Sequence, residues 1–307
     1  MTEKRRITPI APSTRAFIEE ARHAPNYSWK DFIHGYVYAR WPYLYIGTGV
    51  GESRLAHILG PILAWLSRFR PSPPEDAPNR PTFANGYHGK VVTLDAAKQL
   101  VSVDQDISLT NLEHVIPFEK ARDIIFTDPD HIAVLDCPCR ASRPDPCLPL
   151  DVCLIVGEPF AGFILEHNPE RARAITSDEA ISILSAEHER GHVHHAYFKD
   201  AMLGRFYAIC NCCACCCGAM QATRNGIPMI IPSGYVALVE PDNCIGCETC
   251  ARYCQFGALS LDDDFVISVD ESACMGCGVC VDKCKNEALS LVLDPNRVAP
   301  LELQQLM

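Results

Sequence analysis

The longest apolar and aromatic stretch of the chain runs from Trp29 to Trp65. A helix that crosses a bilayer needs about twenty consecutive apolar residues. Charged side chains interrupt this stretch at Arg40, Glu52 and Arg54, so no membrane span is predicted. The apolar spacing from about Ser53 to Arg68 predicts an amphipathic helix that packs in a core or on a partner, and peripheral contact with a membrane is the alternative.

Three alternating glycines lie inside this stretch, at Gly47, Gly49 and Gly51. Together with Tyr43–Ile46 before them, they predict a strand and a tight turn that lead into the amphipathic helix. A dinucleotide-binding loop requires another glycine where Glu52 stands, so the plain turn is the preferred interpretation.

The flanking segments carry weaker patterns. Residues 1–30 are polar and contain several prolines, and they are expected to form an arm that packs on another part of the protein. Prolines between Arg70 and Arg80 predict a linker or surface loop, because proline fixes its own φ and restricts the residue before it. Further along, the patterns predict strands at Val91–Leu94 and Leu100–Val103, a helix at Pro117–Phe126, and a buried strand at Ile132–Leu135.

Two further helices have clear boundaries. The sequence Thr176-Ser-Asp-Glu179 is a capping box that opens a helix ending near Gly191, and Gly218–Arg224 predicts a helix that ends at Asn225-Gly226. Between them, a strand is predicted from the histidine group through Phe198. That group contains His192, His194 and His195, with His188 one turn upstream. No cysteine or carboxylate stands beside these histidines, so we expect solvent-facing or hydrogen-bonded side chains, and a metal site is the alternative.

Cysteine usage and charge narrow the class of protein. The 307 residues include 18 cysteines, none before Cys137 and none after Cys284, which is the grouping of metal ligands. Met1 to Ala16 shows no secretory leader, so a disulfide-rich secreted scaffold is not predicted and a cytoplasmic location is expected. The formal charge is 27 − 38 = −11, which disfavours nucleic-acid binding and suits encounters with a basic redox partner protein.

The C-terminal part of the chain contains the pattern CxxCxxCxxxC twice. The first copy is Cys244, Cys247, Cys250 and Cys254, and the second is Cys274, Cys277, Cys280 and Cys284. The sequence Gly257-Ala-Leu-Ser-Leu after the first copy is echoed by Glu287-Ala-Leu-Ser-Leu after the second, which indicates an internal duplication. Gly246 and Gly276 lie between ligands, where the backbone must bend tightly.

This spacing is typical of iron–sulfur clusters. Three thiolates at this spacing wrap three corners of a cube, while the following helix carries the fourth cysteine away to the other cube. Residues 236–293 accordingly resemble the bacterial-type two-cluster ferredoxins, although Gln255 and Lys285 stand where that family usually has proline. The arrangement implies two [4Fe-4S] clusters, one held by Cys244, Cys247, Cys250 and Cys284, and the other by Cys274, Cys277, Cys280 and Cys254. A pair of zinc knuckles is the alternative, which this spacing suits poorly.

Ten cysteines remain upstream. They are Cys137, Cys139, Cys147, Cys153, Cys210, Cys212, Cys213, Cys215, Cys216 and Cys217. The last six precede a predicted helix, whose N-terminus stabilises thiolates and an anionic cluster, and Arg140 after Cys139 is placed to do the same. Adjacent cysteines diverge, so these six do not all bind one cube. One or two further iron–sulfur clusters are predicted, and a zinc site made of Cys137, Cys139, Cys147 and Cys153 is the alternative.

Residues 130–290 as a whole resemble a group of cysteine-rich 4Fe-4S binding proteins of anaerobes, on the CxCR and CNCCxCCC motifs ahead of the ferredoxin-like segment. The predicted fold class is α+β. Residues 1–80 form an N-terminal arm and an aromatic, amphipathic helical segment, and residues 81–235 a cysteine-rich metal-binding domain of α/β type. Residues 236–293 form a ferredoxin-like domain with a two-fold internal repeat, and 294–307 a tail.

These features predict an electron-transfer protein or redox subunit of an oxidoreductase system. Low-potential electrons would pass between two C-terminal clusters, the upstream cluster domain and a partner oxidoreductase. One alternative is a reductase whose upstream cluster itself binds and reduces a small substrate. Another is a zinc-stabilised interaction protein with an appended ferredoxin. Motifs of conventional catalysis, such as GxSxG, HExxH or a P-loop, are absent from the sequence.

Overall fold

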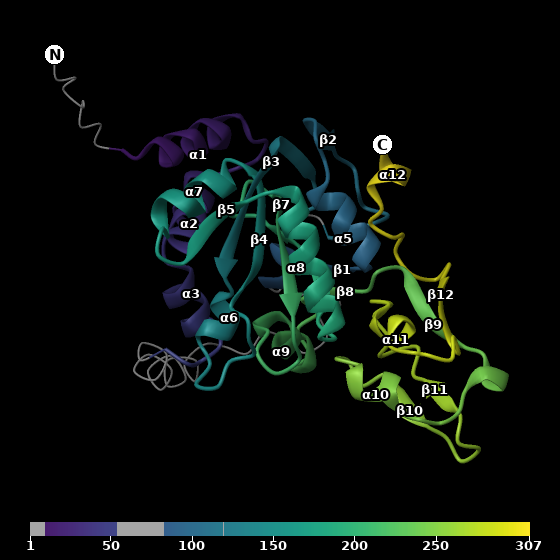
Figure 1. The fold of residues 1–307 in the computed structure, drawn as a ribbon. Helices are drawn as coiled ribbons and strands as arrows, with labels where there is room; N and C mark the ends of the chain where they lie inside the picture. The colour runs from purple at the N-terminus through teal and green to yellow at the C-terminus, as the bar shows by residue number, and fades with distance from the viewer. Residues whose placement is uncertain (1–9, 54–82, 119) are drawn as a thin grey trace, which may run out of the picture.

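A computed structural model describes residues 10–53, 83–118 and 120–307, which form an eight-stranded sheet with helices on both faces and a small C-terminal module (Figure 1). The helices are α1 (Pro12–His23), α2 (Trp29–Arg40), α3 (Pro42–Gly49), α5 (Leu94–Val101), α6 (Pro138–Ala141), α7 (Phe160–His167), α8 (Ser177–Glu189), α9 (Gly218–Arg224), α10 (Thr249–Tyr253), α11 (Val279–Asp282) and α12 (Leu303–Leu306), with 3₁₀ turns η1 (Phe83–Asn85) and η2 (Pro241–Asn243). The strands are β1 (Tyr87–Val92), β2 (Ile107–Leu109), β3 (Ile124–Asp136), β4 (Asp151–Glu158), β5 (Ala172–Ile175), β6 (Val193–Lys199), β7 (Arg205–Cys212), β8 (Ile230–Ile231), β9 (Tyr235–Val239), β10 (Leu259–Leu261), β11 (Ile267–Val269) and β12 (Leu289–Leu293).

The large sheet has the strand order β2-β3-β4-β7-β6-β1-β8, and β5 pairs with the part of β3 nearest the cysteine turn. All of its pairs are antiparallel except the short β1–β8 pair. The α+β class is therefore confirmed. The α/β type predicted for the upstream domain is wrong, because a sheet built from neighbouring antiparallel strands lacks the parallel crossovers of that class.

Alternation along the strands divides the interior into two cores. On β6, Val193 and Tyr197 enter the core covered by α1, α2 and α7, whereas Ala196 and Phe198 enter the core covered by α5 and α8. Period-two alternation is what a strand buried on both faces requires. The C-terminal helix α12 also packs on α5, through the buried Leu303.

Several local predictions are confirmed. The buried strand at Ile132–Leu135 lies in β3, the histidine strand is β6, and the helices after Thr176 and Cys217 are α8 and α9. The Thr176 hydroxyl accepts a hydrogen bond from the backbone N–H of Glu179 at 3.2 Å, as a helix cap does.

Other local predictions are wrong. Tyr43–Ile46 belongs to the helix α3 rather than to a strand, and Leu100 lies in the helix α5. Pro117–Phe126 is not a helix: Ala121 has a left-handed φ of 54°, and the strand β3 already begins at Ile124. The amphipathic helix predicted from Ser53 onward and the proline-rich linker lie outside the described residues, apart from Ser53 itself.

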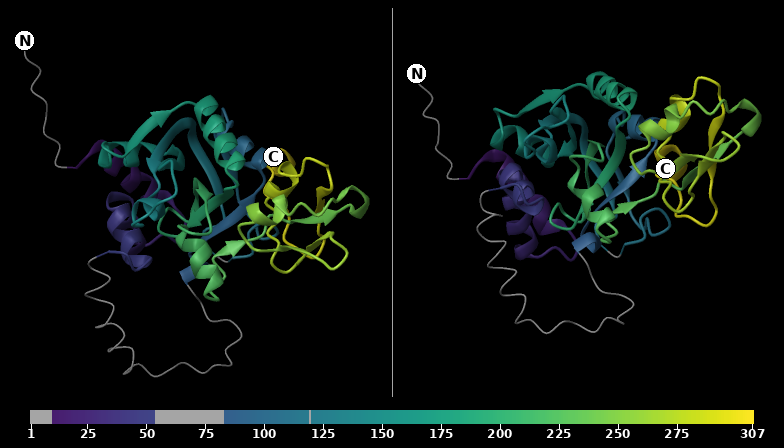
Figure 2. Two further views of the ribbon diagram at one scale, coloured as in Figure 1. Left: turned by 60° about the horizontal axis from the view of Figure 1, so that its bottom comes forward. Right: turned by 90° about the horizontal axis from the view of Figure 1, so that it is seen from below.

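The C-terminal module has an approximate two-fold repeat and lies beside the sheet, on the side away from α1 (Figure 2). One half pairs β10 with β11, the other pairs β12 with β9, and each contains a short helix, α10 or α11. Gly246 and Gly276 both have φ of 65°. A Cβ atom on them would lie 2.5 Å from the Phe265 carbonyl oxygen and 2.2 Å from that of Tyr235, so both positions require glycine.

No helix within the described ranges combines the length and the apolar content that crossing a membrane demands.

Candidate metal centres and the adjoining cavity

The C-terminal module encloses two small cavities lined by cysteine. Cys274, Cys277, Cys280 and Cys254 line one of them, and Cys244, Cys247, Cys250 and Cys284 line the other. Each cavity therefore takes three cysteines from one motif and the last cysteine from the other. The chain brings together the same two sets of four that the sequence predicts.

The two-fold repeat extends to the hydrogen bonds at the sulfur atoms. The backbone N–H of Ala258 donates to Cys254 Sγ, and that of Ala288 donates to Cys284 Sγ, both at 3.3 Å. Hydrogen bonds to ligand sulfur are one of the factors that set the reduction potential of a cluster. Both crossing cysteines therefore accept the same backbone hydrogen bond.

The profile of the 4Fe-4S dicluster domain family matches residues 243–288. The C-terminal segment is a ferredoxin-type 4Fe-4S module. No curated protein matches the chain. The interpretation of the sheet domain therefore depends on its own residues.

The two cavities of the ferredoxin module differ in their position. Phe256, Met275 and Cys277, beside the cavity of the second motif, pack against the core of the sheet domain. Ile245, which lines the other cavity, is 72% exposed, and Phe265, which lies against Gly246 of the first motif, is 71% exposed. We call the first cavity proximal and the second distal, with respect to the sheet domain.

Polar contacts fix the ferredoxin module on the sheet domain. His188 lies 2.6 Å from the Asp282 carboxylate, and the Lys283 ammonium donates to Glu189 at 2.6 Å. Gln255, the residue directly after Cys254, accepts a hydrogen bond from the Ala214 N–H at 2.8 Å and donates to the Gly191 carbonyl at 3.0 Å.

The departure from proline at Gln255 thus has a structural role. Its side chain joins the loop after a proximal cysteine to the cysteine loop 213–217 of the sheet domain. Proline has no side-chain amide and would leave both backbone groups without this partner.

A cavity of about 610 Å³ lies in the sheet domain on the side of α2 and α3. Eight of the ten upstream cysteines are among its described lining residues: Cys137, Cys139, Cys153, Cys210, Cys212, Cys213, Cys216 and Cys217. Cys153 Sγ lies 3.4 Å from Cys210 Sγ, and Cys212 Sγ lies 3.3 Å from Cys217 Sγ. The first pair faces across the β4–β7 ladder, so strand register brings together residues far apart in sequence.

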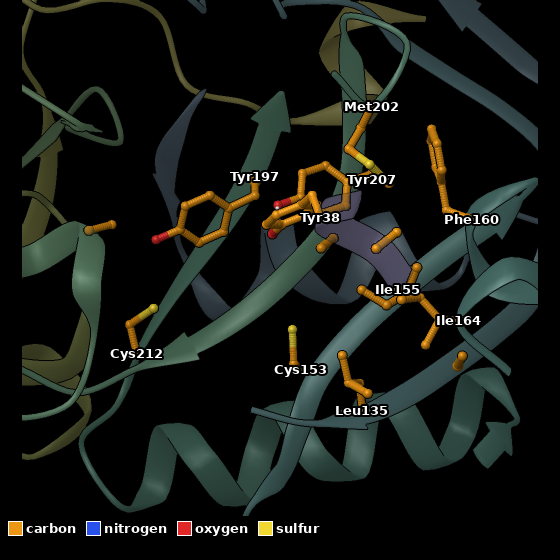
Figure 3. Close-up of a cluster of buried hydrophobic side chains, with 14 of the residues drawn as sticks. Tyr38, Leu135, Cys153, Ile155, Phe160, Ile164, Tyr197, Met202, Tyr207 and Cys212 are labelled. Atoms are coloured by element: carbon orange, nitrogen blue, oxygen red, sulfur yellow. Dashed lines mark hydrogen bonds between the residues drawn. The ribbon is translucent and has the colours of Figure 1, made fainter. Parts of the chain in front are cut away.

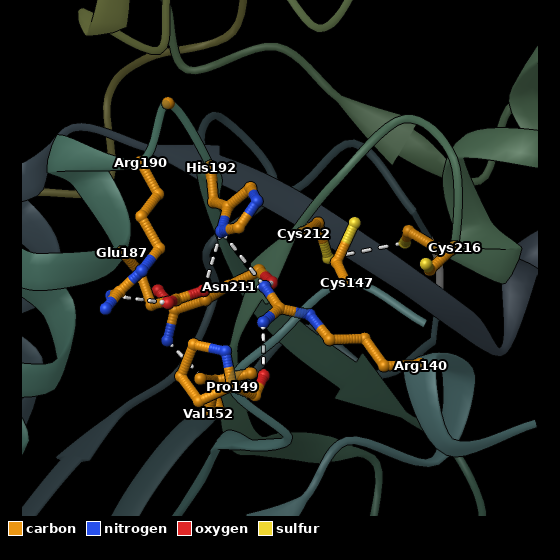
Figure 4. Close-up of polar contacts among 12 residues, drawn as sticks. Arg140, Cys147, Pro149, Val152, Glu187, Arg190, His192, Asn211, Cys212 and Cys216 are labelled. Atoms are coloured by element: carbon orange, nitrogen blue, oxygen red, sulfur yellow. Dashed lines mark hydrogen bonds and ion pairs between the residues drawn. The ribbon is translucent and has the colours of Figure 1, made fainter. Parts of the chain in front are cut away.

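The CxCR motif is anchored by a buried ion pair. The Arg140 guanidinium lies between Glu187, His192 and Pro149 (Figure 4), and it donates to the Glu187 carboxylate and to the Pro149 carbonyl at 2.6 Å each. Burial disfavours its charged form, but Glu187 outweighs this effect and the pKa of Arg140 is raised. Arg140 therefore stays charged and holds the turn that carries Cys137 and Cys139 at the cavity.

The expectation of solvent-facing histidines is wrong, because His192, His194 and His195 are all buried. The expectation of hydrogen bonds is correct for two of them: His192 Nδ1 lies 2.6 Å from Glu187, and His194 Nδ1 lies 2.7 Å from the Asn211 side chain. Burial lowers the pKa of His194 to about 3, so this histidine is neutral.

His195 differs from the other two. Both of its ring nitrogens are buried without a hydrogen-bond partner, and its ligand atoms lie within 4.8 Å of the sulfurs of Cys212 and Cys217. The fold thus supplies the cysteines that the sequence does not place beside this histidine. Cys212 lowers the pKa of Cys217, and His195 acts in the same direction.

Opposite the sulfur atoms, the cavity has an aromatic wall that the sequence analysis missed. Tyr38, Tyr197 and Tyr207 border the same space as Cys153 and Cys212 (Figure 3). The Tyr38 and Tyr207 hydroxyls are 2.8 Å apart, and burial raises the pKa of these phenols. Alternation along β6 is the signal that would have placed Tyr197 and Lys199 on the cysteine face.

Lys199 is the cation of this wall. Its ammonium lies 4.3 Å from the Tyr87 ring centroid and 5.0 Å from that of Tyr38, and burial lowers its pKa to about 8. An ammonium held by aromatic faces keeps its N–H groups available to a bound molecule. The cavity therefore combines soft sulfur ligands with a buried lysine whose pKa lies below the ordinary value.

Cys147 and Cys215 form a second cysteine group with Cys213 and Cys216, which also line the cavity. The sulfurs of Cys147, Cys213, Cys215 and Cys216 all lie within 4.8 Å of one another. The alternative site made of Cys137, Cys139, Cys147 and Cys153 is not formed, because Cys147 joins this group whereas Cys153 pairs with Cys210.

Proposed function

We propose that this protein is an iron–sulfur electron-transfer component of a cytoplasmic oxidoreductase system. Two [4Fe-4S] clusters carry low-potential electrons through the ferredoxin module, one on Cys244, Cys247, Cys250 and Cys284 and the other on Cys274, Cys277, Cys280 and Cys254. The observation that carries this proposal is the composition of the two cavities, each lined by three cysteines of one motif and the last of the other.

The distal cluster would meet the partner oxidoreductase. Ile245, which lines its cavity, and Phe265, which lies against Gly246, are exposed large apolar side chains that suit a small and transient protein contact. The proximal cluster lies against the sheet domain, and the hydrogen bonds of Gln255 lead from Cys254 to the cysteine loop 213–217. Electrons would therefore pass between partner, distal cluster, proximal cluster and sheet domain in that sequence.

The sheet domain would hold a further iron–sulfur cluster at the large cavity. Its candidate ligands are six lining cysteines: Cys137, Cys139, Cys153, Cys210, Cys212 and Cys217. Cys137 caps the N-terminus of α6 and Cys217 that of α9. The partial positive charge at both helix starts favours negative charge on these sulfur atoms.

Pairs of substitutions test the crossed ligation. Cys254→Ser with Cys277→Ser removes two ligands of one cluster, so the other cluster of the module should remain. Cys254→Ser with Cys247→Ser removes one ligand from each, so both should be lost. Iron and sulfide quantitation on anaerobically purified protein, with electron paramagnetic resonance during reductive titration, measures the outcome. The opposite pattern would show that each motif keeps its own fourth cysteine.

A second candidate function is reduction of a small molecule inside the large cavity. The volume of about 610 Å³, the buried Lys199 and the tyrosine wall favour it, because a pure electron relay needs no such space. The molecule would take electrons through the clusters and protons from Lys199. Cyanide, a small ligand of open metal positions, should shift the resonance signal of the sheet-domain cluster. An unchanged signal would contradict reduction of a small molecule and would leave electron transfer as the proposed function.

A further inference from the structure

We propose that Cys147, Cys213, Cys215 and Cys216 form a tetrathiolate site for a single zinc ion, separate from every iron–sulfur cluster. All four sulfurs lie within 4.8 Å of one another. Cys147 Sγ is 3.0 Å from Cys215 Sγ, which is 3.6 Å from Cys216 Sγ.

The size of this group distinguishes the two kinds of metal centre. Four thiolates at about 2.3 Å from one tetrahedral zinc ion lie about 3.8 Å from each other. A four-iron cube occupies the space between its ligands, so its cysteine sulfurs stand farther apart. Among the described residues, three groups of potential metal ligands are compact, in that all ligand atoms of a group lie within 4.8 Å of one another. None of these three groups includes a cysteine of the ferredoxin module. The four cysteines of each ferredoxin site are therefore spaced more widely than the four cysteines of this set.

Two separate loops build the compact set. Cys147 comes from the segment between α6 and β4, and the other three cysteines come from the turn between β7 and α9 (Figure 4 shows Cys147 and Cys216). Arg143 ties the loops together, because its guanidinium donates to the Cys216 carbonyl at 3.3 Å and to the Glu52 carboxylate at 2.8 Å. The turn also closes on itself through a hydrogen bond of 3.1 Å from the Cys217 N–H to the Cys213 carbonyl.

The position of the site indicates a structural role. Cys213 and Cys216 belong to the wall of the large cavity, and Ala214 between the ligands donates its N–H to Gln255 of the ferredoxin module. Zinc has no redox chemistry of its own, so an ion here would fix this loop without storing electrons. This inference does not depend on the proposed electron transfer.

Metal analysis of the full-length protein tests the proposal. We expect one zinc per chain and, at the zinc absorption edge, four sulfur neighbours at about 2.3 Å. Cys147→Ser and Cys216→Ser should each lower the zinc content severalfold and leave the iron of the ferredoxin module unchanged. Cys153→Ser is the matched control, which should keep its zinc because Cys153 pairs with Cys210.

Three results would overturn the proposal. They are absence of zinc from the wild-type protein, a mononuclear iron in its place, or a joint loss of iron and sulfide in the Cys147→Ser protein. The absorption measurement needs only the wild-type chain, so it decides even if a variant fails to fold. Failure of the proposed electron transfer would appear instead in the iron content and the resonance signals.

Discussion

The two cysteine-rich regions of this protein are built in different ways. In the ferredoxin module, the ligands lie at fixed short spacings, and a two-fold repeat exchanges one cysteine between the halves. In the sheet domain, the cysteines come from a turn after β3, from β4, and from β7 and the loop behind it. Sequence spacing therefore specifies the first kind of site, whereas strand register specifies the second.

The surroundings of the sulfur atoms differ as well. The sheet domain buries the titratable side chains of Arg140, Glu187, His194 and Lys199. The buried core of the ferredoxin module consists of apolar residues and cysteines. Buried titratable groups are costly unless paired, and they gather where chemistry or precise positioning is needed. The two regions therefore differ in the surroundings of their cysteines, which are apolar in the ferredoxin module and include buried titratable groups in the sheet domain.

The largest expected effect is a loss of stability in the sheet domain that leaves the ferredoxin module unchanged. Arg140→Met leaves Glu187 buried without its main cationic partner, so we expect a loss of about 3–5 kcal/mol in the unfolding free energy of the sheet domain. Chemical denaturation followed by circular dichroism measures it. The signals of the ferredoxin module should persist, because its cysteines fold around their own clusters.

Arg190→Met is the matched control for this substitution. Arg190 contacts the same Glu187 carboxylate at 3.0 Å but is about half exposed, so its removal should cost below about 1 kcal/mol. Equal losses in the two variants would show that burial of the Arg140 pair does not distinguish the sheet domain.

Acid should affect the sheet domain through His88. Burial lowers the pKa of His88 to about 4, and its ring stacks on Phe118 and Phe198. The pKa of His88 in the folded protein lies below the ordinary 6.5. The contribution of neutral His88 to the unfolding free energy is therefore fully present above pH 6.5 and is lost as the pH falls toward 4. A shift of this size corresponds to about 3 kcal/mol. The unfolding free energy of the wild type should fall by that amount relative to His88→Phe, and parallel pH curves would contradict the prediction.

Much of the local structure and of the C-terminal sites could be predicted from sequence, because the signals there are local. The capping box at Thr176 and the apolar run Ile132–Leu135 each specify one element without help from the rest of the chain. The helix α5 replaces the strand predicted at Leu100–Val103, because Thr93 caps the helix and its buried positions follow a helical period.

The upstream site could not be predicted in the same way. Cys153 meets Cys210 only through the register of β4 and β7, and Cys147 meets Cys213 only because two loops converge. The left-handed Ala121, which prevents a helix at Pro117–Phe126, has no signal in a sequence that favours helix at alanine. Long-range pairing of this kind is decided by the packing of the whole sheet.

A smaller effect is expected at the tight bends of the ferredoxin module. Gly276→Ala places a Cβ atom 2.2 Å from the Tyr235 carbonyl oxygen at a φ of 65°, so both a clash and backbone strain oppose it. We expect about 2–3 kcal/mol and loss of iron from the proximal cluster. Gly257→Ala, at a φ of 67° with nothing within 4 Å, isolates the strain and should cost about 1 kcal/mol. Similar iron contents in the two variants would disprove the role of the close contact.

The smallest effect on stability is expected where the two regions meet. Gln255→Ala removes the hydrogen bonds to the Ala214 N–H and the Gly191 carbonyl, which should cost about 1–2 kcal/mol. Lys285→Ala is the matched control, because Lys285 occupies the equivalent place in the other repeat, is exposed, and makes no hydrogen bond or ion pair with any described residue. In stopped-flow experiments, the clusters of the ferredoxin module should be reduced at the wild-type rate in both variants. The proposed sheet-domain cluster should be reduced more slowly in Gln255→Ala alone. Equal rates in both variants would mean that electrons do not cross at this contact, and the two regions would have to be connected elsewhere.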